Sequence, residues 1–223
     1  METKSRGDLV INGLGASNGG QFNLVKINGK GTINSGIECS EFECNGSGVV
    51  NGDIVADKTK VSGNAKINGN VKSRMLVISG TAKVDQNLQV EHLHVSGKAT
   101  VHGRVKSEEI KIKGKLTVDE DCEAEIFKAE SQFKIGGLLN AEQIDIKMFG
   151  ECRANEIGGQ SIRIKANGSF FSHLYKSVFR PQLEAEFIEG DKVEIEYTNA
   201  KIVRGNHVTI GPNSTIGLVE YTT

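Results

Sequence analysis

The sequence predicts an all-β fold, a single-stranded parallel β-helix whose chain winds in triangular turns of about 17 residues. Three observations lead to this prediction: a glycine that recurs at a fixed step, apolar columns that keep the same step, and turn-forming residues that interrupt each repeat at regular points. The recurring glycines, each 17 residues after the last, are Gly29, Gly46, Gly63, Gly80, Gly97 and Gly114.

Apolar side chains keep register with these glycines. Two positions before each glycine stand Ile27, Cys44, Val61, Ile78, Val95 and Ile112. Four positions after it stand Ile33, Val50, Ile67, Val84, Val101 and Val118. A further column with small side chains holds Gly31, Gly48, Ala65, Ala82 and Ala99. The apolar positions alternate with polar ones and are rich in β-branched residues, which is typical of strands. We therefore expect these columns to point inward and to stack turn upon turn.

Three breaks in the alternation predict three corners per turn. One break is the glycine column, the second includes Asn51-Gly52 and Asn68-Gly69, and the third falls among charged residues such as Glu108-Glu109. Because asparagine and glycine tolerate left-handed backbone angles, we expect the first two breaks to be sharp turns of that kind.

The repeat divides the chain into four parts. Residues 1–8 form a polar N-terminal tail, residues 9–168 the β-helix core, residues 169–182 an insert, and residues 183–223 the closing turns. The insert carries apolar side chains at helical spacing, Phe171, Leu174, Tyr175 and Val178. It is predicted to be a short helix or loop packed on the side of the β-helix. The alternative is an apolar contact for a membrane or for a partner, as in a soluble adaptor.

Composition limits the partners. With 27 Lys and Arg against 28 Asp and Glu, the net charge of −1 gives no general attraction to nucleic acid. The N-terminus lacks the apolar core of a signal peptide, and no apolar run reaches the roughly 18 residues that cross a bilayer. The four cysteines form no CxxC pair, so buried thiols in a cytoplasmic protein are expected.

The sequence lacks the marks of β-helix enzymes. A hexapeptide-type acyltransferase, the main enzymatic alternative, would repeat at 18 residues and use a loop histidine as the general base. His92 and His94 flank an inward Leu93, so both should point to solvent. No acidic or thiol side chain is expected to join them in binding a metal. The chain is therefore predicted to be no enzyme and to need no cofactor and no metal.

The two ends of the β-helix are the predicted functional sites. A terminal turn exposes backbone donors and acceptors that invite pairing with another chain. The candidate contact residues of the N-terminal turn are Leu9, Ile11 and Phe22. Those of the C-terminal turn are Ile210, Ile216, Leu218, Val219 and Tyr221.

The glycine-punctuated repeat resembles the bactofilins, a family of polymer-forming bacterial cytoskeletal proteins, over roughly residues 9–223. The closing stretch from Ile188 through Ala200 to Tyr221 is similar to a Gram-positive, Bacillus-type branch. The resemblance implies a right-handed helix, nucleotide-independent non-polar filaments, and a scaffold for cell shape, polar localisation or motility. It implies the chain itself as partner, with bactofilin paralogues or motility and cell-envelope proteins as further candidates. Many members carry a short apolar N-terminal membrane motif that this sequence lacks, so membrane association stays open beside the expected cytoplasmic location.

Overall fold

The computed structural model describes residues 6–166 and 181–222. The chain divides into two compact units, Met1–Lys106 (unit 1) and Ser107–Thr223 (unit 2). Among the described residues all regular structure is β-strand, and in each unit the strands pair in parallel with counterparts one turn away. The predicted all-β parallel β-helix is confirmed.

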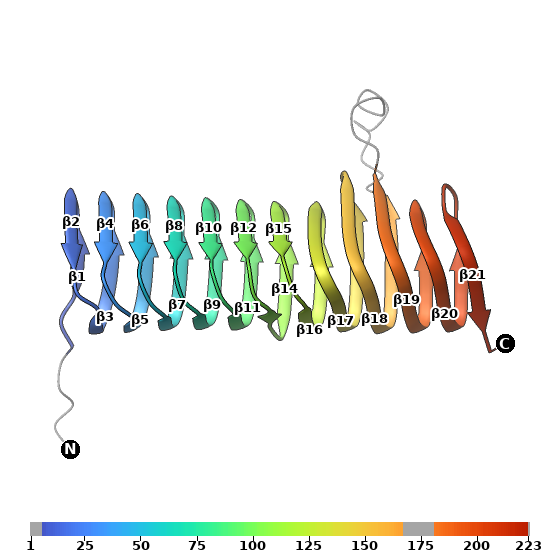
Figure 1. The fold of residues 1–223 in the computed structure, drawn as a ribbon, viewed down its shortest axis with the longest axis horizontal. Helices are drawn as coiled ribbons and strands as arrows, with labels where there is room; N and C mark the ends of the chain where they lie inside the picture. The colour runs from blue at the N-terminus through green and yellow to red at the C-terminus, as the bar shows by residue number, and fades with distance from the viewer. Residues whose placement is uncertain (1–5, 167–180, 223) are drawn as a thin grey trace, which may run out of the picture. The chain divides into compact units, whose positions relative to one another are not determined.

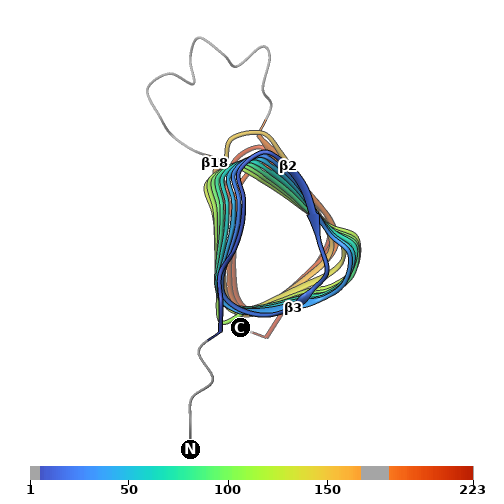
Figure 2. The same cartoon turned by 90° about the vertical axis from the view of Figure 1, so that its left-hand side faces the viewer.

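Unit 1 alternates long strands, which bend across one corner, with short strands that close the turn (Figure 1). Seen end-on, its blue to green turns superimpose in a three-sided outline (Figure 2). Its strands are β1 (Leu9–Ile11), β2 (Leu14–Ser17), β3 (Gly20–Ile27), β4 (Lys30–Ile33), β5 (Ile37–Cys44), β6 (Ser47–Val50), β7 (Ile54–Val61), β8 (Asn64–Ile67), β9 (Val71–Ile78), β10 (Thr81–Val84), β11 (Leu88–Val95), β12 (Lys98–Val101) and β13 (Val105–Lys106).

The strand register of unit 1 reproduces the sequence period. Ile37 pairs with Ile54, 17 residues later, and Thr81 pairs with Lys98 at the same step. The first turn is one residue shorter, because Leu9 pairs with Val25. Each inward side chain therefore stacks on the same column of the neighbouring turn.

Unit 2 has a less even period. Ile144 pairs with Ile162, an 18-residue step, whereas Leu183 pairs with Thr198, a 15-residue step. The 18-residue step is visible in the sequence, where Ile144 and Ile146 are followed by Ile162 and Ile164. The strands are β14 (Glu109–Ile112), β15 (Lys115–Val118), β16 (Cys122–Ala129), β17 (Gln132–Met148), β18 (Glu151–Ala166), β19 (Gln182–Ile195), β20 (Thr198–Ile210) and β21 (Thr215–Tyr221).

The inward columns form the core of each unit. In unit 1 the glycine-flanking residues, Ile27 and Ile78 among them, are buried, as are the alanines of the small column. In unit 2 the same sequence column changes to large side chains, Leu116 and Phe133, which are also buried. The ring of Phe133 packs edge-on against Phe127 with 5.3 Å between centroids. This one column is thus small in unit 1 and large in unit 2.

The expected reason for the glycine column is wrong. Within the described part of the chain, the corner glycines of this column do not adopt the left-handed backbone angles that were predicted for them, and neither do the Asn51-Gly52 and Asn68-Gly69 corners. Instead, a Cβ on Gly46 or Gly63 would lie under 3.0 Å from the backbone carbonyl oxygen of the glycine one turn earlier. Glycine is required there because successive turns approach each other backbone to backbone.

Candidate functional site

The last turn of unit 2 leaves its inward columns uncovered. Ile210 continues the column of Ile195, yet 42% of Ile210 is exposed against 1% of Ile195. Tyr221 stands one turn after the buried Gly205 and is 69% exposed. The difference arises because no further turn among the described residues covers these side chains.

The structure brings all five C-terminal candidate residues onto this last turn. Ile210 ends β20, and the other four lie on β21, which pairs with β20 on one side. Leu218 is exposed, while Ile216 and Val219 are half-buried. Together they form an apolar end face in unit 2, here called the C-terminal face.

The C-terminal face is held by a charged cluster around Arg204. The guanidinium Nε lies 2.6 Å from the Glu220 carboxylate of β21 and a terminal nitrogen 3.8 Å from Glu189. It also lies over the Phe187 ring, 5.3 Å from the centroid. The hydrogen bond to Glu220 and its charge raise the pKa of Arg204 further above its ordinary value. Arg204 thereby ties the last strand to the two turns before it.

The first turn of unit 1 forms the N-terminal face. Of the three candidate residues, Ile11 is buried, whereas Leu9 and Phe22 are half-buried. Leu9 and Ile11 lie on β1 in the columns of Val25 and Ile27, and Phe22 lies on β3. The three residues belong to the outermost turn, as the sequence analysis expected of an end.

Sequence reasoning missed an exposed apolar residue on the first turn. Leu14 is 87% exposed and begins β2, in register with Lys30. It was passed over because its column points outward and is otherwise polar in unit 1, with Lys30, Ser47 and Asn64 in the next turns. A leucine alone among these polar residues is the signal that could have found it.

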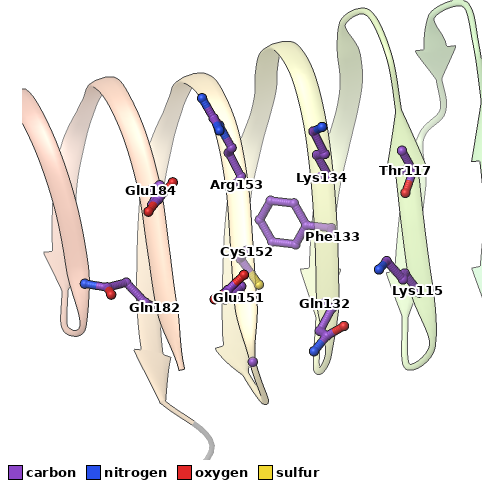
Figure 3. A pocket seen from close by; sticks show the side chains of 11 residues that line it. Lys115, Thr117, Gln132, Phe133, Lys134, Glu151, Cys152, Arg153, Gln182 and Glu184 are labelled. Carbon is purple, nitrogen blue, oxygen red and sulfur yellow. The ribbon is translucent and has the colours of Figure 1, made fainter. Parts of the chain in front are cut away.

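The long side of unit 2 has a shallow hollow of about 440 Å³ (Figure 3). Lys115, Lys134 and Arg153 line it together with Glu151 and Glu184, so its charges are mixed. These residues come from successive turns of the same side. Its two carboxylates, Glu151 and Glu184, thus stand among three cationic side chains.

Cys152 also lines this hollow, but it is not an activated nucleophile. Its thiol is buried and donates to the carbonyl of Ser131 at 3.3 Å. Burial raises the pKa of this thiol to about 11, so it stays protonated at neutral pH. The other three cysteines are likewise free and buried, as the sequence predicted.

The histidines and other side chains that could bind a metal are spread apart in the described residues. His92 and His94 lie on the outer side of β11, around the buried Leu93. Within residues 6–166 and 181–222, no three His, Cys, Asp or Glu side chains gather closely enough to hold a metal ion. The possible partner contact formed by Phe171, Leu174, Tyr175 and Val178 lies outside the described residues and stays a prediction.

Comparison with known proteins identifies the family. A family model described as "Bactofilin: Polymer-forming cytoskeletal" matches residues 2–89. The chain is also 56% identical over 214 residues to "Uncharacterized protein YhbE" of Bacillus subtilis (strain 168), which covers 96% of this chain and 90% of YhbE. The chain belongs to the bactofilin family.

A second relative matches a shorter part of this bactofilin. "Uncharacterized protein YhbF" of the same organism is 42% identical over 86 residues, or 38% of this chain and 34% of YhbF. No solved structure matches the chain significantly. The family is polymer-forming and cytoskeletal, which agrees with a structural role. The described residues include no helix of the length and apolar character needed to cross a membrane.

Proposed function

We propose that this bactofilin self-associates through its terminal turns into cytoskeletal filaments. The single observation that carries the proposal is the contrast along the inward columns, which are buried within each unit and open at the last turn. The change from 1% exposure at Ile195 to 42% at Ile210 is the clearest case. A second copy stacked on the C-terminal face would cover these side chains as an internal turn does.

The apolar surface of the C-terminal face gives this association a driving force. Full burial of a large apolar side chain contributes about 1.5–3 kcal/mol. Several such side chains are needed, because association also costs rotational and translational freedom. Ile210, Leu218 and Tyr221 are the exposed large side chains that supply it.

The backbone of the terminal strands supports the same contact. β1 pairs with β3 on one side, and β21 pairs with β20 on one side, so each leaves an unpaired edge among the described residues. Unpaired edges of this kind are templates for strand addition. If like faces meet, each contact is two-fold and alternation of the two contacts gives an open, non-polar filament.

The proposed assembly needs no nucleotide, cofactor or metal. Its two ingredients, apolar side chains and backbone hydrogen-bonding groups, both belong to the chain itself. We further propose that the filament acts in the cytoplasm as a scaffold for cell shape, polar localisation or motility. Paralogues of the same family could join the filament through the same end faces.

Negative-stain electron microscopy of the purified protein tests this function. We expect filaments in buffer that contains EDTA and no nucleotide. A uniform population of small particles across protein concentration and salt would contradict the proposal. A parallel assay measures binding of acyl-CoA and of a polysaccharide. Saturable binding of either compound would favour an enzyme.

A further inference from the structure

Among the described residues, the corner formed by Asn12 and Gly13 lacks the hydrogen bonds that the later corners of unit 1 make to the turn before them. In each later turn the corresponding corner docks on the turn before it. Asn28 and Gly29 both donate their backbone N–H to the carbonyl of Ile11, at 2.9 and 3.2 Å. One turn on, Asn45 and Gly46 do the same to Ile27, at 2.8 and 3.0 Å.

The asparagine side chains form a ladder that runs in the same direction. The side-chain amide of Asn45 donates to Asn28 Oδ1 at 3.0 Å, and the amide of Asn28 donates to Asn12 Oδ1 at 2.8 Å. The ladder ends at Asn12, whose amide nitrogen has no partner in the described part of the chain. The backbone N–H groups of Asn12 and Gly13 likewise donate to no carbonyl there.

Gly13 departs from the other glycines of its column in the space around it. A Cβ on Gly29 or Gly46 would collide with the carbonyl of the preceding turn, whereas a Cβ on Gly13 would meet nothing within 4 Å. Gly13 also has no left-handed backbone angle that would call for glycine. Nothing in the described residues of this chain therefore requires glycine at position 13.

We propose that the Asn12–Gly13 corner seats a second copy of this chain by close backbone contact, and that Gly13 is the residue that permits the approach. In the assembly, this corner would then make the close backbone contact that Gly29 and Gly46 make inside the molecule. The N–H groups and the Asn12 amide meet acceptors of the second copy, and the missing side chain at position 13 leaves room for its backbone. This assignment rests on the proposed end-to-end association.

A second copy is the occupant that the geometry favours. The internal corners show that a backbone edge of the same β-helix can approach this shape with hydrogen bonds of 2.8–3.2 Å, there from the preceding turn of a parallel stack. In a two-fold contact between like faces, the acceptors would be the carbonyls on the unpaired edge of the second copy's first turn. The corner carries no charged side chain of its own, and the neighbouring Leu14 is exposed and apolar. These features suit the backbone edge and apolar end of another β-helix better than an ion or a nucleic acid.

The test compares Gly13→Ala with Gly7→Ala in the full-length protein. Both glycines have open space around the added Cβ, but Gly7 lies before β1 and outside the corner column. At protein concentrations too low for the wild type to sediment, we expect both variants to keep the wild-type circular dichroism spectrum and melting temperature. Gly13→Ala should raise the critical concentration for sedimentation about tenfold, the equivalent of one lost backbone hydrogen bond or so. Gly7→Ala should leave it unchanged.

The outcomes separate this inference from the proposed function. If the wild type does not sediment at any concentration, end-to-end association itself is overturned. If the wild type sediments and Gly13→Ala sediments equally well, association stands and the close contact at Gly13 is overturned. A lower melting temperature of unassembled Gly13→Ala, measured at a concentration at which the wild type does not sediment, would also overturn it, because Gly13 would then serve the fold of its own molecule. As a second variant, Asn12→Asp keeps the acceptor for Asn28 and removes the outward amide, so it too should weaken sedimentation, in high salt as in low salt.

Discussion

The carbonyl oxygen of Gly46 faces the α-carbon of Gly63 so closely that a Cβ on Gly63 would lie under 3.0 Å from it. The same relationship links Gly63 to Gly80 and Gly80 to Gly97. The glycine column is therefore a line of backbone-to-backbone contact along one corner of unit 1, and its members are fixed by the turn before them.

Gly63→Ala should destabilise the protein. The added methyl group meets backbone atoms, which cannot move aside as the end of a flexible side chain could, so the corner must shift. Overpacking of this kind typically costs about 1–3 kcal/mol. The midpoint of urea unfolding measures the loss, and Ser62→Ala, an exposed neighbour on the same corner, should leave the midpoint almost unchanged.

The sequence predicts the turn length and the inward columns because both depend on a repeated pattern of residue types. Ile27, Val61 and Ile78 point inward in the structure as the period requires. The reason for the glycines could not be predicted, because a close approach between turns and a left-handed turn both select glycine. The backbone angles of these glycines and the position of the Gly46 carbonyl distinguish the two.

The end faces could be predicted only in part. The residues of the last turn follow from the place where the repeat stops, as for Ile210 and Tyr221. Leu14 was missed because its column is polar in the next turns. Its exposure results from the outward direction of its side chain at the start of β2. The anchoring role of Arg204 was missed because its partners, Glu189 and Glu220, stand one turn away on either side.

Ile78→Asp should prevent stable folding of unit 1. The side chain is buried between two apolar layers, Val61 and Val95, so the carboxylate would lose its hydration without a partner. We expect a loss of more than about 4 kcal/mol, seen as a collapsed circular dichroism signal or insoluble protein. Met75→Asp introduces the same charge on the outer side of the same strand and should change stability by less than about 0.5 kcal/mol.

Tyr221→Arg should block association at the C-terminal face. A guanidinium placed on an apolar end face would have to be desolvated in the contact, so filaments should shorten or disappear in negative stain. Val55→Arg supplies the control, because Val55 is also an exposed apolar residue but lies on a long side of unit 1. Filaments of normal length from Tyr221→Arg would exclude the C-terminal face from the assembly contact.

The buried thiols predict a loss of stability at alkaline pH. Burial raises the pKa of Cys122 from the ordinary 9.0 to about 12. Below pH 9 the thiol is protonated in both the folded and the unfolded chain, and its contribution is fully present. Above pH 9 the unfolded chain releases the proton first, so stability falls as the pH approaches 12.

Comparison of the wild type with Cys122→Ala isolates this effect. The urea midpoint of the wild type should fall more steeply between pH 8 and pH 10 than that of the variant, because all other titrating groups are shared; these two pH values bracket the ordinary pKa of 9.0. Equal slopes would show that the Cys122 thiol does not couple to folding. At pH 8 the native wild type should also react slowly with a disulfide reagent and rapidly once denatured.

Arg204→Gln should loosen the last strand. The variant loses the ion pairs to Glu220 and Glu189 and the contact with the Phe187 ring. Hydrogen–deuterium exchange should therefore become faster in residues 215–221, with little change in β18. Arg163→Gln removes an ion pair to Glu194 in an internal turn, and it should leave exchange in residues 215–221 as in the wild type.

The even register of unit 1 bears on how the protein reaches its fold. A residue pairs with counterparts 16 or 17 positions away, as Leu9 does with Val25 and Ile37 with Ile54. No pairing in the described strands of this unit waits for a distant part of the chain, so the contact order is low for an all-β protein. Each turn can close as soon as the ribosome has released the next one, and unit 1 can grow from its N-terminus while translation continues.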